Sequence, residues 1–146
     1  MKKKILCFIP AKGRSIGLKN KNLKKIKNKT LVEITTSLAK KSRLFYKIVL
    51  SSDSNKILKI GKNLKVDTHS RPKKISDDKA RTEEAILYSL EKIEPKPDYV
   101  VILQVTSPLR KIDSLKKFIK RCIKNKYDTC LSVSKIDNQI SNIGKT

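Results

Sequence analysis

The sequence contains little glycine, proline or aromatic residue: four glycines and five prolines occur among 146 residues, and aromatic side chains make up 5%. The shortage of Gly and Pro, with hydrophobic residues at 38% spread over the whole length, indicates a folded chain and excludes a low-complexity one. The few aromatic rings provide a poor stacking platform for single-stranded nucleic acid. The length favours a single domain over residues 1–146.

Long apolar segments are also missing. No stretch approaches the roughly 20 residues that a helix needs to cross a bilayer. The first residues, Met-Lys-Lys-Lys, are not followed by the apolar region and small-residue cleavage site of a signal peptide. We therefore expect a cytoplasmic protein.

Cysteine is rare and has no metal-binding spacing. Cys7, Cys122 and Cys130 each lie among apolar residues in a predicted strand or helix. Small buried thiols in a reducing compartment fit this pattern better than a disulfide or a catalytic thiol.

Acidic residues are few. The 13 Asp and Glu stand against 36 Lys and Arg, which gives a formal net charge of +23 and a field that favours anions of any kind. A polyanion such as nucleic acid is one partner that this charge allows. However, most of the cations are lysines scattered over the whole chain, as AT-rich coding would also produce, so solvated faces are the favoured interpretation.

Four short runs predict β-strands at residues 5–9, 47–51, 99–104 and 129–133. Each is nearly continuous in apolar residues instead of alternating, which is typical of parallel strands that are covered on both faces.

Helical patterns separate these strands. Thr30 and Glu33 form a capping-box signature before a helix that carries Leu31, Ile34 and Leu38 on one face. Ser54 can cap a second helix, a third lies near residues 80–93, and a fourth begins at Asp113. The further apolar positions of the last three helices are Ile57, Leu58 and Leu64; Ile86, Leu90 and Ile93; and Leu115, Ile119 and Cys122. Alternating strands and helices predict an α/β fold with a mostly parallel sheet and flanking helices.

A ligand site is expected beyond the carboxyl ends of such strands. The segments at these ends are residues 10–22, 51–54, the loop near Arg71, and 104–110. In the first, Gly13 and Gly17 allow backbone amides to approach an anion, and the cations Lys12, Arg14, Lys19 and Lys21 supply charge. A polyphosphate would fit, although the segment is neither a Walker loop nor a dinucleotide fingerprint, and an ordinary surface loop stays open.

Five motifs together resemble the acylneuraminate cytidylyltransferase family, the CMP-sialic acid synthetases and related CMP-nonulosonic acid synthetases. They are "IPAKGRSIGLKNKN" at 9–22, "SSDS" at 51–54, "HSRP" at 69–72, "SDD" at 76–78 and "LQVTSPLR" at 103–110. They occur in the family's order, at compatible distances and at predicted strand ends, and they cover nearly the whole chain. The resemblance implies a Rossmann-like nucleotidyltransferase domain that transfers CMP from CTP to an acidic sugar and releases pyrophosphate.

The resemblance also implies roles for particular residues. Lys12 and Lys21 would act as catalytic cations on the triphosphate. Arg71 would read the cytosine edge, Thr82 would touch the nucleotide, and Gln104 would bind the sugar acid. The full nucleotide-binding set is Ala11, Lys12, Gly13, Ser15, Lys21, Asn22, Arg71 and Thr82. Helix capping is an open alternative for Thr82.

Three further residues of these loops have less defined roles. Ser107 and Arg110 share the loop of Gln104 and could meet a carboxylate. Asp53 ends another strand, where capping or loop bracing explains it as well as catalysis does.

The chain departs from the family pattern at several positions. Lys12 stands where Arg is usual and supplies charge without a bidentate fork. Arg14 replaces a Gly, Ile16 a Lys, and Ala80 a small hydroxyl residue. The phosphate contacts are therefore expected to be redistributed.

The family also continues beyond the point that corresponds to Thr146, through further strands, a dimerisation segment and the aspartates that bind magnesium. The resemblance thus implies Mg²⁺ and a homodimer without identifying metal ligands in this sequence. Two alternatives to an active enzyme stay open: a binding-only or inactive remnant, and a basic nucleic-acid-binding protein.

Overall fold

The structure, a computed structural model, describes residues 3–14, 18, 20–76 and 81–133. The chain divides into two compact units, Met1–Ile112 and Asp113–Thr146. The prediction of one domain over residues 1–146 stays a prediction.

The first unit is built around a parallel sheet of four strands in the order β5-β4-β1-β6. Its strands are β1 (Ile5–Pro10), β4 (Lys47–Ser52), β5 (Asp67–Ser70) and β6 (Tyr99–Ile102). Its helices are α1 (Leu31–Ser42), α2 (Asn55–Asn63) and α3 (Thr82–Leu90), with short 3₁₀ turns η1 (Lys21–Leu23) and η2 (Lys73–Ile75) and a hairpin of β2 (Lys25–Ile26) and β3 (Lys29–Thr30). The α/β prediction is confirmed.

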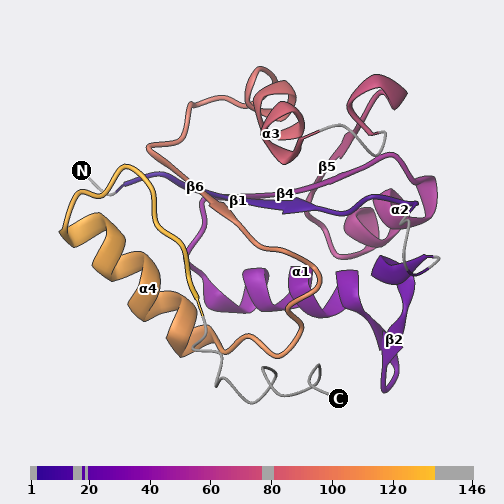
Figure 1. Ribbon diagram of the computed structural model, residues 1–146, viewed down its shortest axis with the longest axis horizontal. Helices are drawn as coiled ribbons and strands as arrows, with labels where there is room; N and C mark the ends of the chain where they lie inside the picture. Colours follow the sequence, from indigo (N-terminus) through magenta and orange to yellow (C-terminus); the bar gives the residue numbers. More distant parts are fainter. Residues whose placement is uncertain (1–2, 15–17, 19, 77–80, 134–146) are drawn as a thin grey trace, which may run out of the picture. The chain divides into compact units, whose positions relative to one another are not determined.

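The helices cover both faces of this sheet. The helix α1 lies on one face and packs against α2, whereas α3 lies on the other face (Figure 1). The strand β1 is central: β4 and β5 continue from it in one direction, and the chain then returns to place β6 on its other side. The order of the strands therefore reverses beside β1, which is where ligands bind in open α/β sheets.

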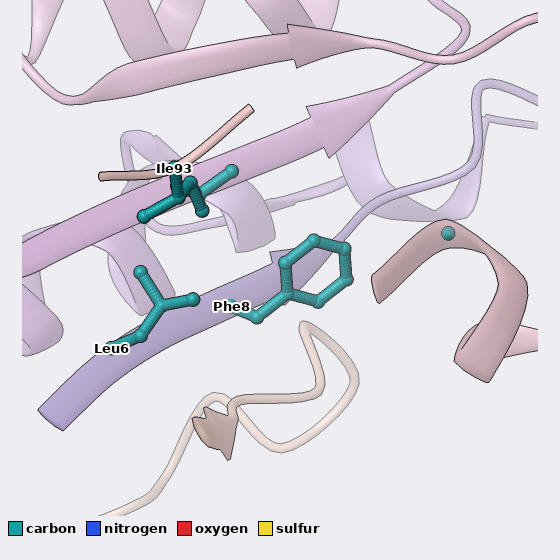
Figure 2. Close-up of a cluster of buried hydrophobic side chains, with 5 residues drawn as sticks. Leu6, Phe8 and Ile93 are labelled. Atoms are coloured by element: carbon teal, nitrogen blue, oxygen red, sulfur yellow. The ribbon is translucent and has the colours of Figure 1, made fainter. Parts of the chain in front are cut away.

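The core beside α3 is formed by alternate residues of β1. Leu6 and Phe8 are fully buried and project to the same side, where Ile93 meets them (Figure 2). Val49 and Ala85 complete the cluster. On the opposite face of β1 lies Cys7, and burial raises the pKa of its thiol well above the ordinary value. The expectation of buried thiols is confirmed for Cys7 and wrong for Cys122 and Cys130, which are only partly buried.

The buried face of α1 differs from the predicted stripe. Its buried residues are Val32, Thr35, Thr36, Ala39 and Ser42, whereas Leu31, Ile34 and Leu38 are only partly buried. Small and β-branched side chains let the helix approach the sheet closely, and its larger aliphatic residues lie beside that contact.

The second unit contains the helix α4 (Ile112–Lys124). Leu115 and Ile119 are its buried residues, as predicted, and its lysines are exposed. The predicted strand at 129–133 is wrong. Among the described residues of this unit there is no strand with which it could pair, and Leu131 and Val133 are 82% and 88% exposed.

Sharp changes of chain direction use residues other than glycine. Asn20, Lys27, Arg43, Lys65 and Lys126 have φ of 53–54°, in the left-handed region. Arg43 ends α1 in this conformation. No helix within the described ranges is long and apolar enough to cross a bilayer.

The predicted capping box at the start of α1 is present. Oε2 of Glu33 accepts hydrogen bonds from the Thr30 amide at 2.6 Å and the Thr30 hydroxyl at 2.8 Å, and the Glu33 amide donates to Oγ1 of Thr30 at 3.2 Å. These bonds hold the pKa of Glu33 below its ordinary value of 4.5.

The box should make the stability of the first unit dependent on pH. Because the folded pKa of Glu33 lies below the unfolded one, the carboxylate stabilises the fold above pH 4.5 and loses that contribution as the pH falls through the folded value. We expect the parent to have a higher free energy of unfolding than Glu33→Gln at about pH 7, and this difference should disappear as the pH falls to about 3. Denaturant unfolding at a series of pH values measures it. Thr30→Ala should cost about 1 kcal/mol at neutral pH. A gap that stays constant with pH would contradict this role.

Candidate functional site

The predicted site residues gather at the carboxyl edge of the sheet. Since all four strands run parallel, Arg71 after β5, Asp53 after β4, Gly13 after β1 and Gln104 after β6 follow one another along this edge. Neighbouring strands lie about 4.8 Å apart, so the edge spans roughly 14 Å from β5 to β6. An extended ligand, and not a single ion, fits this span.

Three hydrogen bonds fix the backbone that follows β1. The buried Ala11 donates its amide to the Ser51 carbonyl at 2.9 Å. The Lys12 carbonyl accepts from Nδ2 of Asn22 at 2.8 Å, and the Gly13 amide donates to Oδ1 of Asp53 at 2.7 Å. The predicted phosphate loop is therefore held from two directions, and its Gly13 amide already meets a carboxylate.

The segment that carries Lys21 is attached to this loop. Lys21 begins η1 and is partly buried, and its neighbour Asn22 is only 6% exposed. The hydrogen bond from Asn22 to Lys12 connects η1 to the end of β1. The structure thus brings the two predicted catalytic lysines into adjoining segments and gives Asn22 a loop-bracing contact beside its predicted nucleotide role.

Gly13 is required by its packing. A Cβ atom added at this position would lie 2.7 Å from Cβ of Ser54. Gly13 thus allows the loop after β1 to approach the start of α2 closely.

Gly13→Ala should weaken binding of CTP, because the added methyl group moves the loop away from β4. An effect of roughly tenfold is expected, equivalent to about 1.4 kcal/mol, and calorimetric titration measures it. The double variant with Ser54→Gly removes the clashing carbon and should restore most of the affinity. Unchanged CTP affinity in Gly13→Ala would show that the loop takes no part in binding.

Arg71, which follows β5 at the carboxyl edge of the sheet, is buried, with 5% of its surface exposed. Its Nη2 donates to the Ser51 carbonyl at 3.0 Å, and Nε is buried without a hydrogen-bond partner. Burial lowers the pKa of its guanidinium, and the Asp53 carboxylate opposes this shift. A buried cation with an unused donor is suited to bind the polar edge of a base, but its predicted contact with cytosine stays a prediction.

Thr82 is the first residue of α3, and the N-cap position belongs to Arg81. The alternative that Thr82 caps the helix is therefore wrong: the backbone turns into the helix one residue earlier. Thr82 is partly buried, and its predicted contact with the nucleotide stays a prediction.

The loop after β6 contains the exposed Gln104, whose carbonyl accepts the Ser107 amide at 3.3 Å. The predicted strand ended at this glutamine, whereas β6 ends at Ile102. Burial lowers the pKa of the Arg110 guanidinium, and Nη1 of Arg110 is buried without a hydrogen-bond partner among the described residues. The predicted contacts of Gln104, Ser107 and Arg110 with a sugar acid stay predictions.

Several predicted residues lie outside the described ranges. They are Ser15, Ile16, Gly17, Lys19, Asp77, Asp78 and Ala80. For Asp53, the sequence left loop bracing open beside capping and catalysis, and its hydrogen bond with Gly13 is a loop-bracing contact. No signal in the sequence identified Gly13 as the partner.

The described residues do not fit a magnesium site by themselves. Within residues 3–14, 18, 20–76 and 81–133 there is no group of three or more His, Cys, Asp or Glu that could hold a metal ion. Asp53, the carboxylate at the site, is engaged by the Gly13 amide. The magnesium implied by the family resemblance would need ligands beyond the described residues.

Comparison with solved structures defines the class of fold. A CMP:2-keto-3-deoxy-manno-octonic acid synthetase complexed with CTP superimposes with a TM-score of 0.71 at 15% identity, over 84% of this chain and 48% of that one. This chain thus shares the fold of that synthetase over most of its length.

Comparison of sequences defines the family. The sequence profile described as cytidylyltransferase matches residues 6–145, so the chain belongs to the cytidylyltransferase family. An N-acylneuraminate cytidylyltransferase of Escherichia coli is 34% identical over 75% of this chain and 26% of its own length. A pseudaminic acid cytidylyltransferase of Campylobacter jejuni is 32% identical over 84% of this chain and 54% of its own length. The chain therefore spans between a quarter and just over half of these relatives, and the predicted family is confirmed.

Proposed function

We propose that this chain carries the nucleotide-binding part of an enzyme that transfers CMP from CTP to a nonulosonic acid such as sialic or pseudaminic acid. The observation that carries the proposal is the order of groups along the carboxyl edge: Arg71, Gly13 and Gln104 follow three strands of one sheet. Membership of the cytidylyltransferase family and the names of the relatives support the choice of substrates.

The order of groups suggests how the ligands would lie. Cytosine would meet Arg71 at the β5 end, the triphosphate would lie over the loop after β1, and the sugar acid would lie toward Gln104. Lys12 and Lys21 would offset negative charge on the phosphates.

In the reaction, a hydroxyl oxygen of the sugar acid forms a bond to the α-phosphorus of CTP. The bond from that phosphorus to the bridging oxygen breaks, and the β- and γ-phosphates leave as pyrophosphate. The proton of the hydroxyl passes to solvent water as the sugar–phosphate bond forms. Positive charge at Lys12 and Lys21 favours this step because it stabilises the leaving pyrophosphate.

The partners and location follow from the same proposal. CTP and an acidic sugar are the partners, and the cytoplasm is the proposed location, where the free thiol of Cys7 is kept reduced. The homodimer implied by the family resemblance stays a prediction.

Two measurements test the proposal. Calorimetric titration should show CTP binding at least tenfold tighter than ATP or inorganic triphosphate. Pyrophosphate release should then be assayed with CTP, magnesium and a panel of nonulosonic and octulosonic acids, and one member of the panel should give turnover. Equal affinity for CTP and ATP would refute nucleotide selection.

The two alternatives have distinct results. CTP selectivity with silence across the whole panel would favour a binding-only protein. RNA affinity that falls steeply with salt, without a preference for CTP, would favour a nucleic-acid-binding one. Lys62→Ala, which removes a charge from the exposed side of α2, serves as the control for Lys12→Ala and Lys21→Ala, which should lower CTP affinity more.

A further inference from the structure

Asp53 connects two parts of the site that come from different strands. Its Oδ1 accepts the Gly13 amide at 2.7 Å, although 40 positions separate the two residues in the sequence. The same carboxylate acts electrostatically on Arg71 and favours its charged form. One side chain after β4 therefore acts on the loop after β1 and on the cation after β5.

The backbone around Asp53 is itself held in place. The Ser51 carbonyl accepts the Ala11 amide at 2.9 Å and Nη2 of Arg71 at 3.0 Å. The Ser54 amide donates to the Ser52 hydroxyl at 3.1 Å, and the Ser52 carbonyl accepts the Arg71 amide at 2.9 Å. Because Ser51 and Ser52 are bonded to the segments after both neighbouring strands, the carboxylate of the next residue, Asp53, has a defined position.

We propose that Asp53 is a positioning residue for nucleotide binding. Its carboxylate holds the backbone of Gly13, and with it the loop after β1, beside the end of β4. The inference deepens the proposed function and rests on it, since the ligand it concerns is the cytidine triphosphate.

The direction in which triphosphate affinity changes when Asp53 is removed distinguishes a positioning role from a purely electrostatic one. Asp53 places a negative charge beside a site proposed for an anion, so a through-space effect alone would make its removal tighten triphosphate binding. A positioning role gives the opposite result: without the hydrogen bond to Gly13, the loop shifts and the triphosphate binds more weakly.

The experiment compares Asp53→Ala and Asp53→Asn by calorimetric titration with CTP and with inorganic triphosphate. Asp53→Ala should weaken both by roughly tenfold, the loss typical of a hydrogen bond to a charged group. Asp53→Asn keeps an acceptor oxygen for the Gly13 amide and should retain affinity within about threefold of the parent.

Asp98 provides a matched control. Its Oδ2 accepts the Lys4 amide at 2.7 Å, the same kind of contact, but at the residues that precede β6 and β1, on the opposite edge of the sheet. Asp98→Asn makes the same change of charge and should leave CTP affinity unchanged within about twofold. Circular dichroism checks that each variant is folded. If Asp53→Ala does not fold, the comparison of Asp53→Asn with the parent still tests the proposal.

Three results would overturn the proposal. Tighter or unchanged triphosphate binding in Asp53→Ala would show that the residue acts through charge alone or not at all. An equal loss in Asp53→Asn and Asp53→Ala would show that the hydrogen bond to Gly13 is not the cause. A loss of the same size in Asp98→Asn would show that the effect is not specific to the site.

A second readout does not depend on CTP. In the free protein, the amide-proton resonance of Gly13 should move upfield in Asp53→Ala and stay in place in Asp98→Asn. An unchanged resonance in Asp53→Ala overturns the positioning role. If the parent chain shows no preference for CTP, the proposed function fails, whereas this resonance and the affinity for inorganic triphosphate still decide the role of Asp53.

Discussion

Arg71→Ala is expected to weaken CTP binding by roughly 10- to 100-fold, which corresponds to the 1.5–3 kcal/mol of a hydrogen bond made by a charged donor. Arg71 is 5% exposed, so its charge is poorly screened, and its Nε has no hydrogen-bond partner among the described residues. Affinity for inorganic triphosphate should fall much less, because the proposed contact is to cytosine.

Arg71→Lys separates charge from geometry. Lysine keeps the positive charge but lacks the planar fork, so CTP affinity should resemble that of Arg71→Ala more than that of the parent. Arg43→Ala, at the exposed end of α1, is the matched control and should leave CTP affinity unchanged. Titration of each variant with CTP, UTP and triphosphate measures the effect. An equal loss for all three ligands would mean that Arg71 does not recognise the base.

Phe8→Ala should have the largest effect on folding. Phe8 is fully buried in the cluster with Leu6, Val49, Ala85 and Ile93. Removing a buried phenyl ring costs about 3–5 kcal/mol, a large part of the 5–15 kcal/mol that stabilises a typical domain. For a chain of this size, the melting temperature should fall by on the order of 10–20 °C.

Leu109→Ala is the control for this loss. Leu109 is 86% exposed, so its truncation should change the free energy of unfolding by less than about 0.5 kcal/mol. Denaturant unfolding followed by circular dichroism compares the two variants. Losses of similar size would contradict the position of Phe8 in the core.

The fold could be predicted from the sequence where the hydrophobic pattern is strong. The apolar runs of β1, β4 and β6 and the capping box at Thr30 are local signals, and each was read correctly. The strand β5 was missed because its sequence, Asp-Thr-His-Ser, is polar, and it forms by pairing its backbone with β4. The strand predicted at 129–133 failed for the converse reason: the run is apolar, but among the described residues of its unit there is no strand with which its amides and carbonyls could pair.

The candidate site could be predicted in outline and not in detail. Parallel strands bring their carboxyl ends to one edge, so the gathering of Arg71, Gly13 and Gln104 follows from topology. The hydrogen bond between Asp53 and Gly13 depends on the register of β1 against β4, which pairs Pro10 with Ser51. No local pattern encodes that register, so the sequence left capping, loop bracing and catalysis open for Asp53, and the structure shows the loop-bracing contact.

The non-glycine residues with positive φ affect the thermal stability expected of this chain. Lys27, Arg43, Lys65 and Lys126 occupy turns where glycine would be free of the steric cost of a side chain, about 1–2 kcal/mol per residue. A relative with glycine at these turns could keep the same architecture with a wider thermal margin.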